Sequence, residues 1–182
     1  MTDPELRLER LSPAHDLSNF DSGNKVLDTW LKRHAMSAQT MDSARTFVVI
    51  HTDRVVGYVS LTMGSVQRAD PPAKLVRSLP AYPVGMVLIA RLAIDRVEQG
   101  RGLGTRLLAD ALRMAVLAGE AAAARLVVVD AIDEQAAQFY RRHGFTAELG
   151  ESRLYLRMKD VKASAVRNRD TLDDGRSKEE PR

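Results

Sequence analysis

The stretch Glu98–Thr105, "EQGRGLGT", places three glycines within five positions and stands between two segments of different pattern. It follows the apolar run "VGMVLIARLAIDR" at residues 84–96 and precedes residues 106–119, where apolar side chains recur at helical spacing. A glycine loop between a strand and a helix exposes backbone N–H groups at the positive end of the helix dipole. The stretch therefore predicts an anion-binding loop inside a strand–loop–helix unit.

Several kinds of loop carry glycines in this setting. A Walker loop requires a Lys-Ser/Thr pair after its last glycine, and Thr105-Arg106 stands there instead, which excludes it. A dinucleotide fingerprint has the spacing G-x-G-x-x-G in an early βαβ unit, whereas this G-x-G-x-G lies past the middle of the chain. Two interpretations remain open from the string alone: the pyrophosphate loop of a coenzyme A enzyme, and a plain structural loop.

The composition limits the classes of protein to which the chain can belong. Its 182 residues are 45% hydrophobic, which is typical of one soluble globular domain, and no apolar run approaches the roughly 20 residues of a membrane helix. The absence of cysteine excludes disulfides, thiolate metal sites and a cysteine-linked intermediate, and it fits a reducing compartment such as the cytoplasm. The net charge of +3 is compatible with an anionic partner. The histidines show no ligand spacing, so no metal is predicted; they are His15, His34, His51 and His143.

Around the loop, the hydrophobic pattern predicts strands and helices in alternation, an α/β (α+β mixed sheet) protein. The expected strands are 6–11, a hairpin at 46–63 that turns at 52–54, a central strand at 84–96, 125–131 and 153–159. The expected helices are 24–39, 103–118 ending near Gly119, and 133–144, capped by Asp133 and stopped by Gly144. Prolines make 68–83 irregular. We expect one domain at 1–160 and a polar, disordered tail at 161–182.

Residues 89–112, "IARLAIDRVEQGRGLGTRLLADAL", resemble motif A of the GCN5-related N-acetyltransferase (GNAT) superfamily, whose loop reads Q/R-x-x-G-x-G/A. Gln99, Gly102 and Gly104 match that loop. Residues 133–145, "DEQAAQFYRRHGF", resemble the strand–helix unit that follows it in this superfamily, with its tyrosine and its Gly-Phe ending. The resemblance extends from residue 6 to residue 159.

This resemblance implies a twisted sheet that splays open beside its central strand, with acetyl-coenzyme A (acetyl-CoA) in the gap. The pantetheine amides are expected on the backbone of Leu92, Ala93 and Ile94. The pyrophosphate is expected on the loop formed by Gln99, Gly100, Arg101, Gly102, Leu103, Gly104 and Thr105. An amine then attacks the thioester directly, which agrees with the missing cysteine, and Tyr140 gives a proton to the departing thiolate.

Residues 20–35, "FDSGNKVLDTWLKRHA", and residues 55–61 resemble the GNAT toxins of bacterial type II toxin–antitoxin pairs, which share the signature F-x-x-G-x-x-x-L-D-x-W-L. The matching residues are Phe20, Gly23, Leu27, Asp28, Trp30 and Leu31. Trp30 and Leu31 also lie on the apolar stripe of the predicted helix, which favours a packing role for them. The resemblance implies acetylation of the α-amino group of aminoacyl-tRNA, a homodimer, a small DNA-binding antitoxin as partner and a cytoplasmic location without a membrane.

The chemistry of the amine is compatible with this substrate. An α-amino group has a pKa of about 8 in short peptides, against about 10.4 for lysine, so a neutral fraction is present without a general base. An RNA substrate also needs phosphate contacts. The candidates are Arg33, Arg45, Arg77, Arg91, Arg141 and Arg142, of which Arg91 and Arg142 flank the cofactor strand and the tyrosine helix. The alternatives are a GNAT that acetylates a small amine or a protein N-terminus, and a non-catalytic acetyl-CoA sensor, against which Tyr140 argues.

Overall fold

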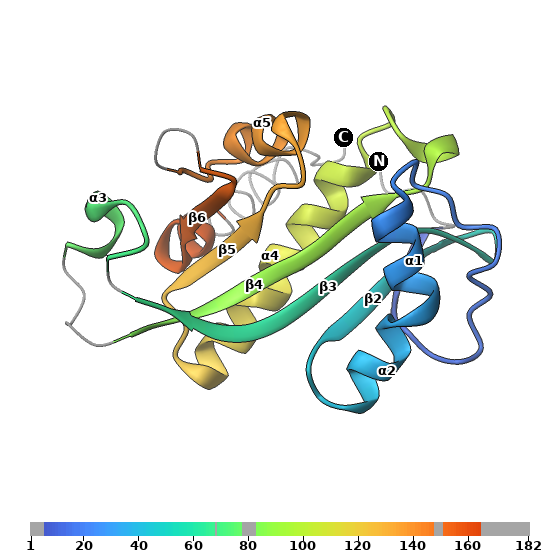
Figure 1. Cartoon of the computed structure of the whole chain (residues 1–182), viewed down its shortest axis with the longest axis horizontal. Helices are drawn as coiled ribbons and strands as arrows, with labels where there is room; N and C mark the ends of the chain where they lie inside the picture. Colours follow the sequence, from blue (N-terminus) through green and yellow to red (C-terminus); the bar gives the residue numbers. More distant parts are fainter. Residues whose placement is uncertain (1–5, 68, 78–82, 148–150, 165–182) are drawn as a thin grey trace, which may run out of the picture.

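Six strands form one mixed sheet whose spatial order follows the chain (Figure 1). They are β1 (Leu6–Arg10), β2 (Arg45–His51), β3 (Arg54–Val66), β4 (Val84–Ile94), β5 (Leu126–Asp130) and β6 (Arg153–Arg157). Neighbouring strands are antiparallel except β4 and β5, which are parallel. This computed structural model describes residues 6–67, 69–77, 83–147 and 151–164. The mixed sheet with a central β4 is confirmed; Pro80 of the irregular segment lies outside the described residues.

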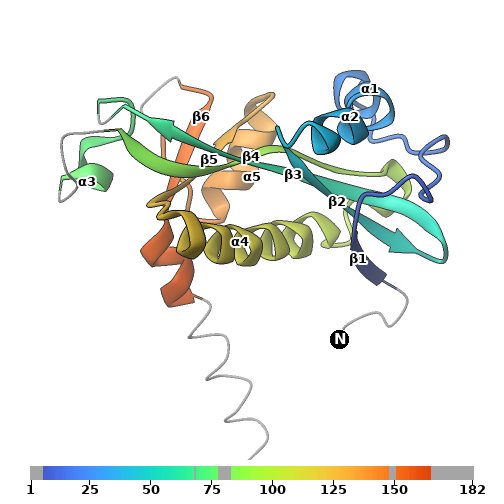
Figure 2. The same cartoon turned by 90° about the horizontal axis from the view of Figure 1, so that it is seen from below.

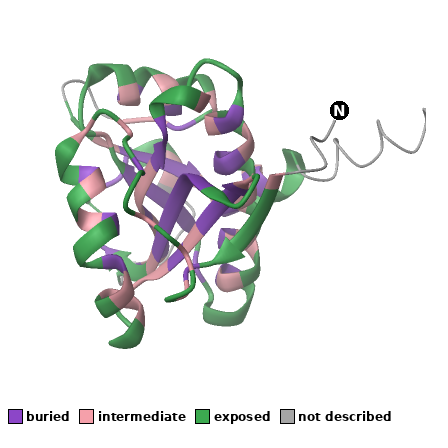
Figure 3. Ribbon diagram, turned by 90° about the vertical axis from the view of Figure 1, so that its right-hand side faces the viewer, coloured by how far each residue is buried: buried purple, intermediate pink, exposed green. Residues whose placement is uncertain are grey.

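Helices cover both faces of the sheet, with α4 on one side and α1 and α2 on the other (Figure 2). The helices are α1 (Lys25–Arg33), α2 (Ala35–Thr40), α3 (Ala73–Val76), η1 (Arg96–Glu98), α4 (Leu103–Ala122) and α5 (Glu134–Arg142). The strands between them are largely buried (Figure 3). Leu107 and Leu108 of α4 belong to the larger core, whereas Leu27 and Leu31 of α1 pack with Tyr58 on the opposite face.

The β2–β3 hairpin turns where the sequence places it. Thr52 and Asp53 have φ values of 46° and 60°, so both central residues lie in the left-handed region. A two-residue turn of this conformation matches the right-handed twist of the flanking strands. The turn fixes the register in which β3 pairs with β2.

Two helix predictions need correction. The helix expected at 24–39 is two helices, α1 and α2, which meet at His34. The helix expected to end near Gly119 continues to Ala122, and Ala123 at φ 57° forms its C-cap. A Cβ on Gly119 would lie 2.8 Å from Cε of Met158. Close packing, not helix termination, therefore explains this glycine.

The chain continues in helical conformation after β6, over residues 158–164. Met158 and Val161 are buried and belong to the larger core. Ordered structure therefore extends four residues past the boundary expected at 160, because Val161 packs against the core. Residues 165–182 of the expected tail lie outside the described residues.

The sheet opens between its two parallel strands. Residues 86–89 of β4 pair with residues 126–129 of β5, whereas residues 91–94 of β4 pair only with β3 among the described residues. The register passes from Ser60 opposite Arg91 to Leu61 opposite Ile89, so Ala90 is an extra residue in a β-bulge. The predicted splay beside the central strand is confirmed.

Candidate active site

The carboxyl ends of β4 and β5 lie at the same edge of the sheet, since parallel strands run in one direction. Leu92, Ala93 and Ile94 occupy β4 beyond its last pair with β5. Their backbone is paired with β3, and its other edge faces the gap between the parallel strands. This edge is suited to bind the amides of an extended ligand as an additional strand would.

The glycine loop follows η1 and leads directly into α4. Gly100 and Gly102 have φ values of 75° and 82°, which favour glycine, and a Cβ at either would have nothing within 4 Å. Gly102 is the N-cap of the 20-residue helix α4 and makes no side-chain capping bond. The first N–H groups of α4 are therefore available to an anion, and the loop is open enough for a diphosphate to approach its backbone.

Gly104 differs from the other two glycines of this loop. It lies in the first turn of α4, and its backbone is not left-handed. A Cβ there would meet Ile94 at 3.8 Å and the Phe139 ring at 3.9 Å, which are ordinary contacts. The packing of the chain alone therefore does not require glycine at this position.

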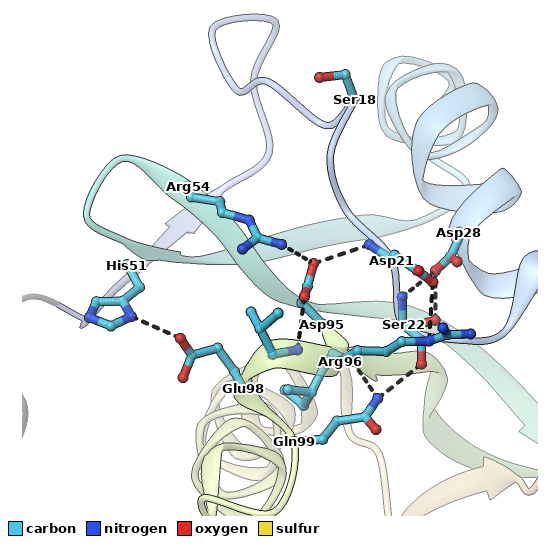
Figure 4. Close-up of polar contacts among 12 residues, drawn as sticks. Ser18, Asp21, Ser22, Asp28, His51, Arg54, Asp95, Arg96, Glu98 and Gln99 are labelled. Carbon is cyan, nitrogen blue, oxygen red and sulfur yellow. Dashed lines mark hydrogen bonds and ion pairs between the residues drawn. The ribbon is translucent and has the colours of Figure 1, made fainter.

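The side chains of two loop residues, Gln99 (Figure 4) and Arg101, are engaged within the protein. The Gln99 Nε2 atom donates to the carbonyl oxygens of Ser22 and Ile94, both at 2.9 Å. Arg101 pairs with Glu98 at 2.8 Å, and the other carboxylate oxygen of Glu98 lies 3.2 Å from Nδ1 of His51. These contacts hold the loop in place, and they leave its backbone N–H groups as the part that can face a ligand.

A buried carboxylate at the end of β4, which sequence reasoning missed, joins the loop to the N-terminal segment (Figure 4). Asp95 is 1% exposed and accepts hydrogen bonds from the backbone of Asp21 and Val97 and from Nη2 of Arg54, the last at 2.7 Å. The signal that could have found it is an acidic residue directly after a buried strand, at the N-cap of η1.

Part of the toxin-like signature forms the turn that Asp95 holds. The Ser22 backbone N–H and hydroxyl both donate to Asp28, at 3.0 and 2.6 Å. Gly23 has a φ of 85°, and a Cβ there would lie 2.9 Å from Nε of Arg96. The signature thus brings the segment before α1 against the start of the glycine loop.

Tyr140 lies on α5, the helix that follows β5 at the same edge of the sheet. Its ring packs edge-on against Phe139 at 5.2 Å and Phe145 at 5.5 Å, and 7% of the residue is exposed. Burial raises the pKa of Tyr140 to about 12. Its hydroxyl has no hydrogen-bond partner within the described part of the chain. A neutral phenol held in this way can donate a proton to a ligand atom.

Trp30 of the signature does more than fill the core. Its ring stacks on Tyr58 at 6.0 Å, and the Arg91 guanidinium lies 4.1 Å from its centroid. The six candidate arginines do not form one cluster of free cations: Arg45 pairs with Asp42, and Arg141 pairs with Glu134. Arg33, Arg77 and Arg142 are exposed, whereas Arg91 is half-buried.

The described residues offer neither a metal site nor a membrane-spanning helix. Within the described ranges, no group of three or more His, Asp or Glu side chains is arranged to hold a metal ion. In the same part of the chain, every helix is too short or too polar to cross a membrane.

Comparison with known proteins identifies the family to which the chain belongs. The profile of the acetyltransferase (GNAT) domain matches residues 42–147. The tRNA-acetylating toxin of Mycobacterium tuberculosis (strain ATCC 25618 / H37Rv) is 39% identical over 155 residues, which is 85% of this chain and 93% of the toxin. AtaT complexed with acetyl-methionyl-tRNAfMet superimposes with a TM-score of 0.80 at 27% identity, over 88% of this chain and 99% of AtaT.

A further solved structure is a tyrosine-to-phenylalanine mutant of AtaT, bound to the C-terminus of the antitoxin AtaR and to acetyl-CoA. It superimposes with a TM-score of 0.77 at 28% identity, over 88% of this chain and 98% of that one. The profile match agrees with two features of the structure, the splayed sheet and the glycine loop at the N-terminus of α4. The chain belongs to the GNAT family of acetyltransferases.

Proposed function

We propose that this acetyltransferase moves the acetyl group of acetyl-CoA to the α-amino group of aminoacyl-tRNA and thereby blocks translation, as the toxin of a toxin–antitoxin pair. The observation that carries the proposal is the likeness to the Mycobacterium tuberculosis tRNA-acetylating toxin over 85% of the chain. That span leaves 27 of the 182 residues outside it, so it extends well beyond the catalytic motifs.

The residues of the gap fit acetyl-CoA. The free edge of β4 at Leu92, Ala93 and Ile94 suits the pantetheine amides. The open backbone of the glycine loop and the uncapped start of α4 suit the pyrophosphate. Gln99 and Arg101 contribute their backbone, because their side chains are bonded to Ser22 and Glu98.

Acetyl-CoA supplies an activated thioester, and the described residues supply the rest of the step. The new bond joins the amine nitrogen to the acetyl carbon, and the carbon–sulfur bond breaks. Tyr140 gives its Oη proton to sulfur; the amine loses a proton to water, from which the phenol recovers one. Because the pKa of Tyr140 is about 12, the phenol is protonated throughout the physiological pH range. Tyr140 is therefore in the protonated form that can donate to the thiolate.

The same proposal includes partners and location. A small DNA-binding antitoxin neutralises the enzyme, two copies form a homodimer, and the protein acts in the cytoplasm. Support for the antitoxin comes from the mutant AtaT structure with the C-terminus of AtaR. Light scattering tests the dimer, and co-expression with the product of the neighbouring gene tests neutralisation.

The decisive experiment incubates the enzyme with charged tRNA and labelled acetyl-CoA. We expect label on the α-amino group of the aminoacyl moiety, and none on uncharged tRNA. Label found only on small amines or on protein N-termini contradicts the tRNA substrate while leaving acetyl transfer intact. A Tyr140→Phe enzyme is the matched negative control.

A further inference from the structure

Arg91 is a half-buried cation whose guanidinium packs on an aromatic ring. Its guanidinium lies over the Trp30 ring, 4.1 Å from the centroid. Within the part of the chain that the structure describes, it makes no hydrogen bond or ion pair. Burial lowers the pKa of Arg91 from its usual value, which indicates that its charge is poorly compensated. A guanidinium in this state gains more from an added anion than a solvated surface arginine does.

The β-bulge sets the direction of this side chain. Met86 and Leu88 of β4 pack with Val66 of β3, on the face opposite α4. In a regular strand every second residue shares a face, so position 91 would point to the α4 side. The extra residue Ala90 reverses the alternation and turns Arg91 toward α1.

Arg91 is next to the β4 segment proposed to bind acetyl-CoA and lies on the face of the sheet that carries α1. Leu92, Ala93 and Ile94 follow immediately along β4, and each residue of a strand spans only about 3.3 Å. The pyrophosphate loop leads into α4, which covers the opposite face of the sheet (Figure 2). An acceptor that approaches from the α1 face therefore passes Arg91.

A second cation extends this surface outward. Arg33 lies three residues beyond Trp30, and residues at this spacing are neighbours on one side of a helix. Arg33 is exposed and has no ion pair among the described residues. The chain thus presents an oriented guanidinium close to the gap and a solvated one farther out.

We propose that Arg91, oriented by Trp30, binds a phosphodiester near the 3′ end of the substrate RNA and positions the esterified amino acid for attack. This inference rests on the proposed function. In an aminoacyl-RNA the carboxyl group of the amino acid is an uncharged ester, so phosphodiesters are the anions nearest to the reacting amine. The planar guanidinium can meet two phosphate oxygens in parallel, whereas a lysine cannot.

The test compares two acceptors that carry the same amine. One is aminoacyl-tRNA; the other is a hydrolysis-resistant aminoacyl-adenosine without any phosphate. For Arg91→Gln we expect kcat/KM to fall at least about tenfold on aminoacyl-tRNA and to be unchanged on the nucleoside. The slope of log(kcat/KM) against log[salt] on tRNA becomes shallower by about 0.7, the effect of one lost phosphate contact on a single strand. Arg91→Lys gives an intermediate loss, and the KM for acetyl-CoA stays constant.

Arg10→Gln is the matched control, since Arg10 is an exposed arginine on the edge strand β1 without an ion pair in the described ranges. Arg10→Gln should leave kcat/KM unchanged on both acceptors. Equal losses on both acceptors, or no loss on aminoacyl-tRNA, overturn the proposal for Arg91. A preference for acidic peptides that disappears in Arg91→Gln also overturns it. If the unchanged enzyme does not acetylate aminoacyl-tRNA at all, the proposed function fails instead.

Discussion

The carboxamide nitrogen of Gln99 donates to the carbonyl oxygen of Ser22 at 2.9 Å, across 77 positions of the chain (Figure 4). The same nitrogen bonds to the carbonyl of Ile94, the last residue of β4. One side chain therefore connects the end of β4, the glycine loop and the turn before α1. The turn before α1 and the glycine loop form one structural unit.

Replacing Gln99 tests this connection. Gln99→Ala removes both donated bonds, and we expect the KM for acetyl-CoA to rise about three- to tenfold, which corresponds to one modest hydrogen bond. Gln99→Glu should raise the KM for acetyl-CoA further, because its carboxylate oxygens would face two carbonyl oxygens without a proton to share. Steady-state kinetics with both variants measures this order. A variant Gln99→Glu with normal KM contradicts the positioning role.

The Asp95 carboxylate should matter more for stability than for binding. It is 1% exposed and satisfies two backbone N–H groups and Arg54. We expect Asp95→Ala to lower the free energy of unfolding by about 3 kcal/mol, at the low end for a buried pair because Arg54 is exposed. Urea unfolding measures the change. Glu120→Ala is the control, since Glu120 of α4 pairs with Lys162 at the surface and its loss should cost less than about 1 kcal/mol.

The glycines of the loop should separate into two kinds. Gly102 has a φ of 82°, so Gly102→Ala should destabilise the protein by about 1 kcal/mol and raise the KM for acetyl-CoA. Gly104 is helical with ordinary contacts at its Cβ position, so Gly104→Ala should stabilise the protein by about 0.5 kcal/mol. Thermal unfolding compares the two. Destabilisation by Gly104→Ala would contradict the geometry of the first turn of α4.

The catalytic assignment predicts a separation of binding from chemistry. Tyr140→Phe keeps the ring that packs against Phe139 and Phe145, and removes only the proton donor. We expect kcat to fall at least about 100-fold, the usual range for general acid catalysis. Calorimetric titration should give an unchanged Kd for acetyl-CoA. Wild-type turnover by the variant would remove Tyr140 from the mechanism.

Local patterns in the sequence predicted the parts of the site that depend on neighbours in the chain. The hairpin turn at Thr52 and Asp53, the strand before the loop and the start of α4 were all predicted in place. The break at His34 was not, because α1 and α2 continue the same apolar spacing. Periodicity records which side of a helix is apolar, and it does not record a change of direction.

The remaining features depend on contacts between distant segments. Gly119 carries no local sign that Met158 packs against it. The direction of Arg91 follows from a bulge at Ala90, which is defined only by the pairing of β3 with β4. Asp95 is likewise recognisable as a structural centre only when Asp21 and Arg54 are brought to it. Sequence reasoning therefore located the glycine loop before α4 and could not show what holds it.

The raised pKa of Tyr140 also predicts how stability depends on pH. Burial raises this pKa from its usual 10 to about 12, so the folded state holds the proton more tightly than the unfolded state. The associated stability is fully present below pH 10 and is lost as the pH rises toward 12. Two pKa units correspond to about 2 to 3 kcal/mol.

Tyr140→Phe lacks this titration, so its free energy of unfolding should fall by that much less than that of the unchanged protein between pH 10 and 12. Urea unfolding of both proteins at pH 8, 10 and 11.5 measures the difference. Other alkaline titrations, such as that of Tyr58, are common to both proteins and cancel. Parallel pH curves would show that the phenol is as well solvated in the folded protein as in the unfolded chain, against the burial on which the proton-donor assignment depends.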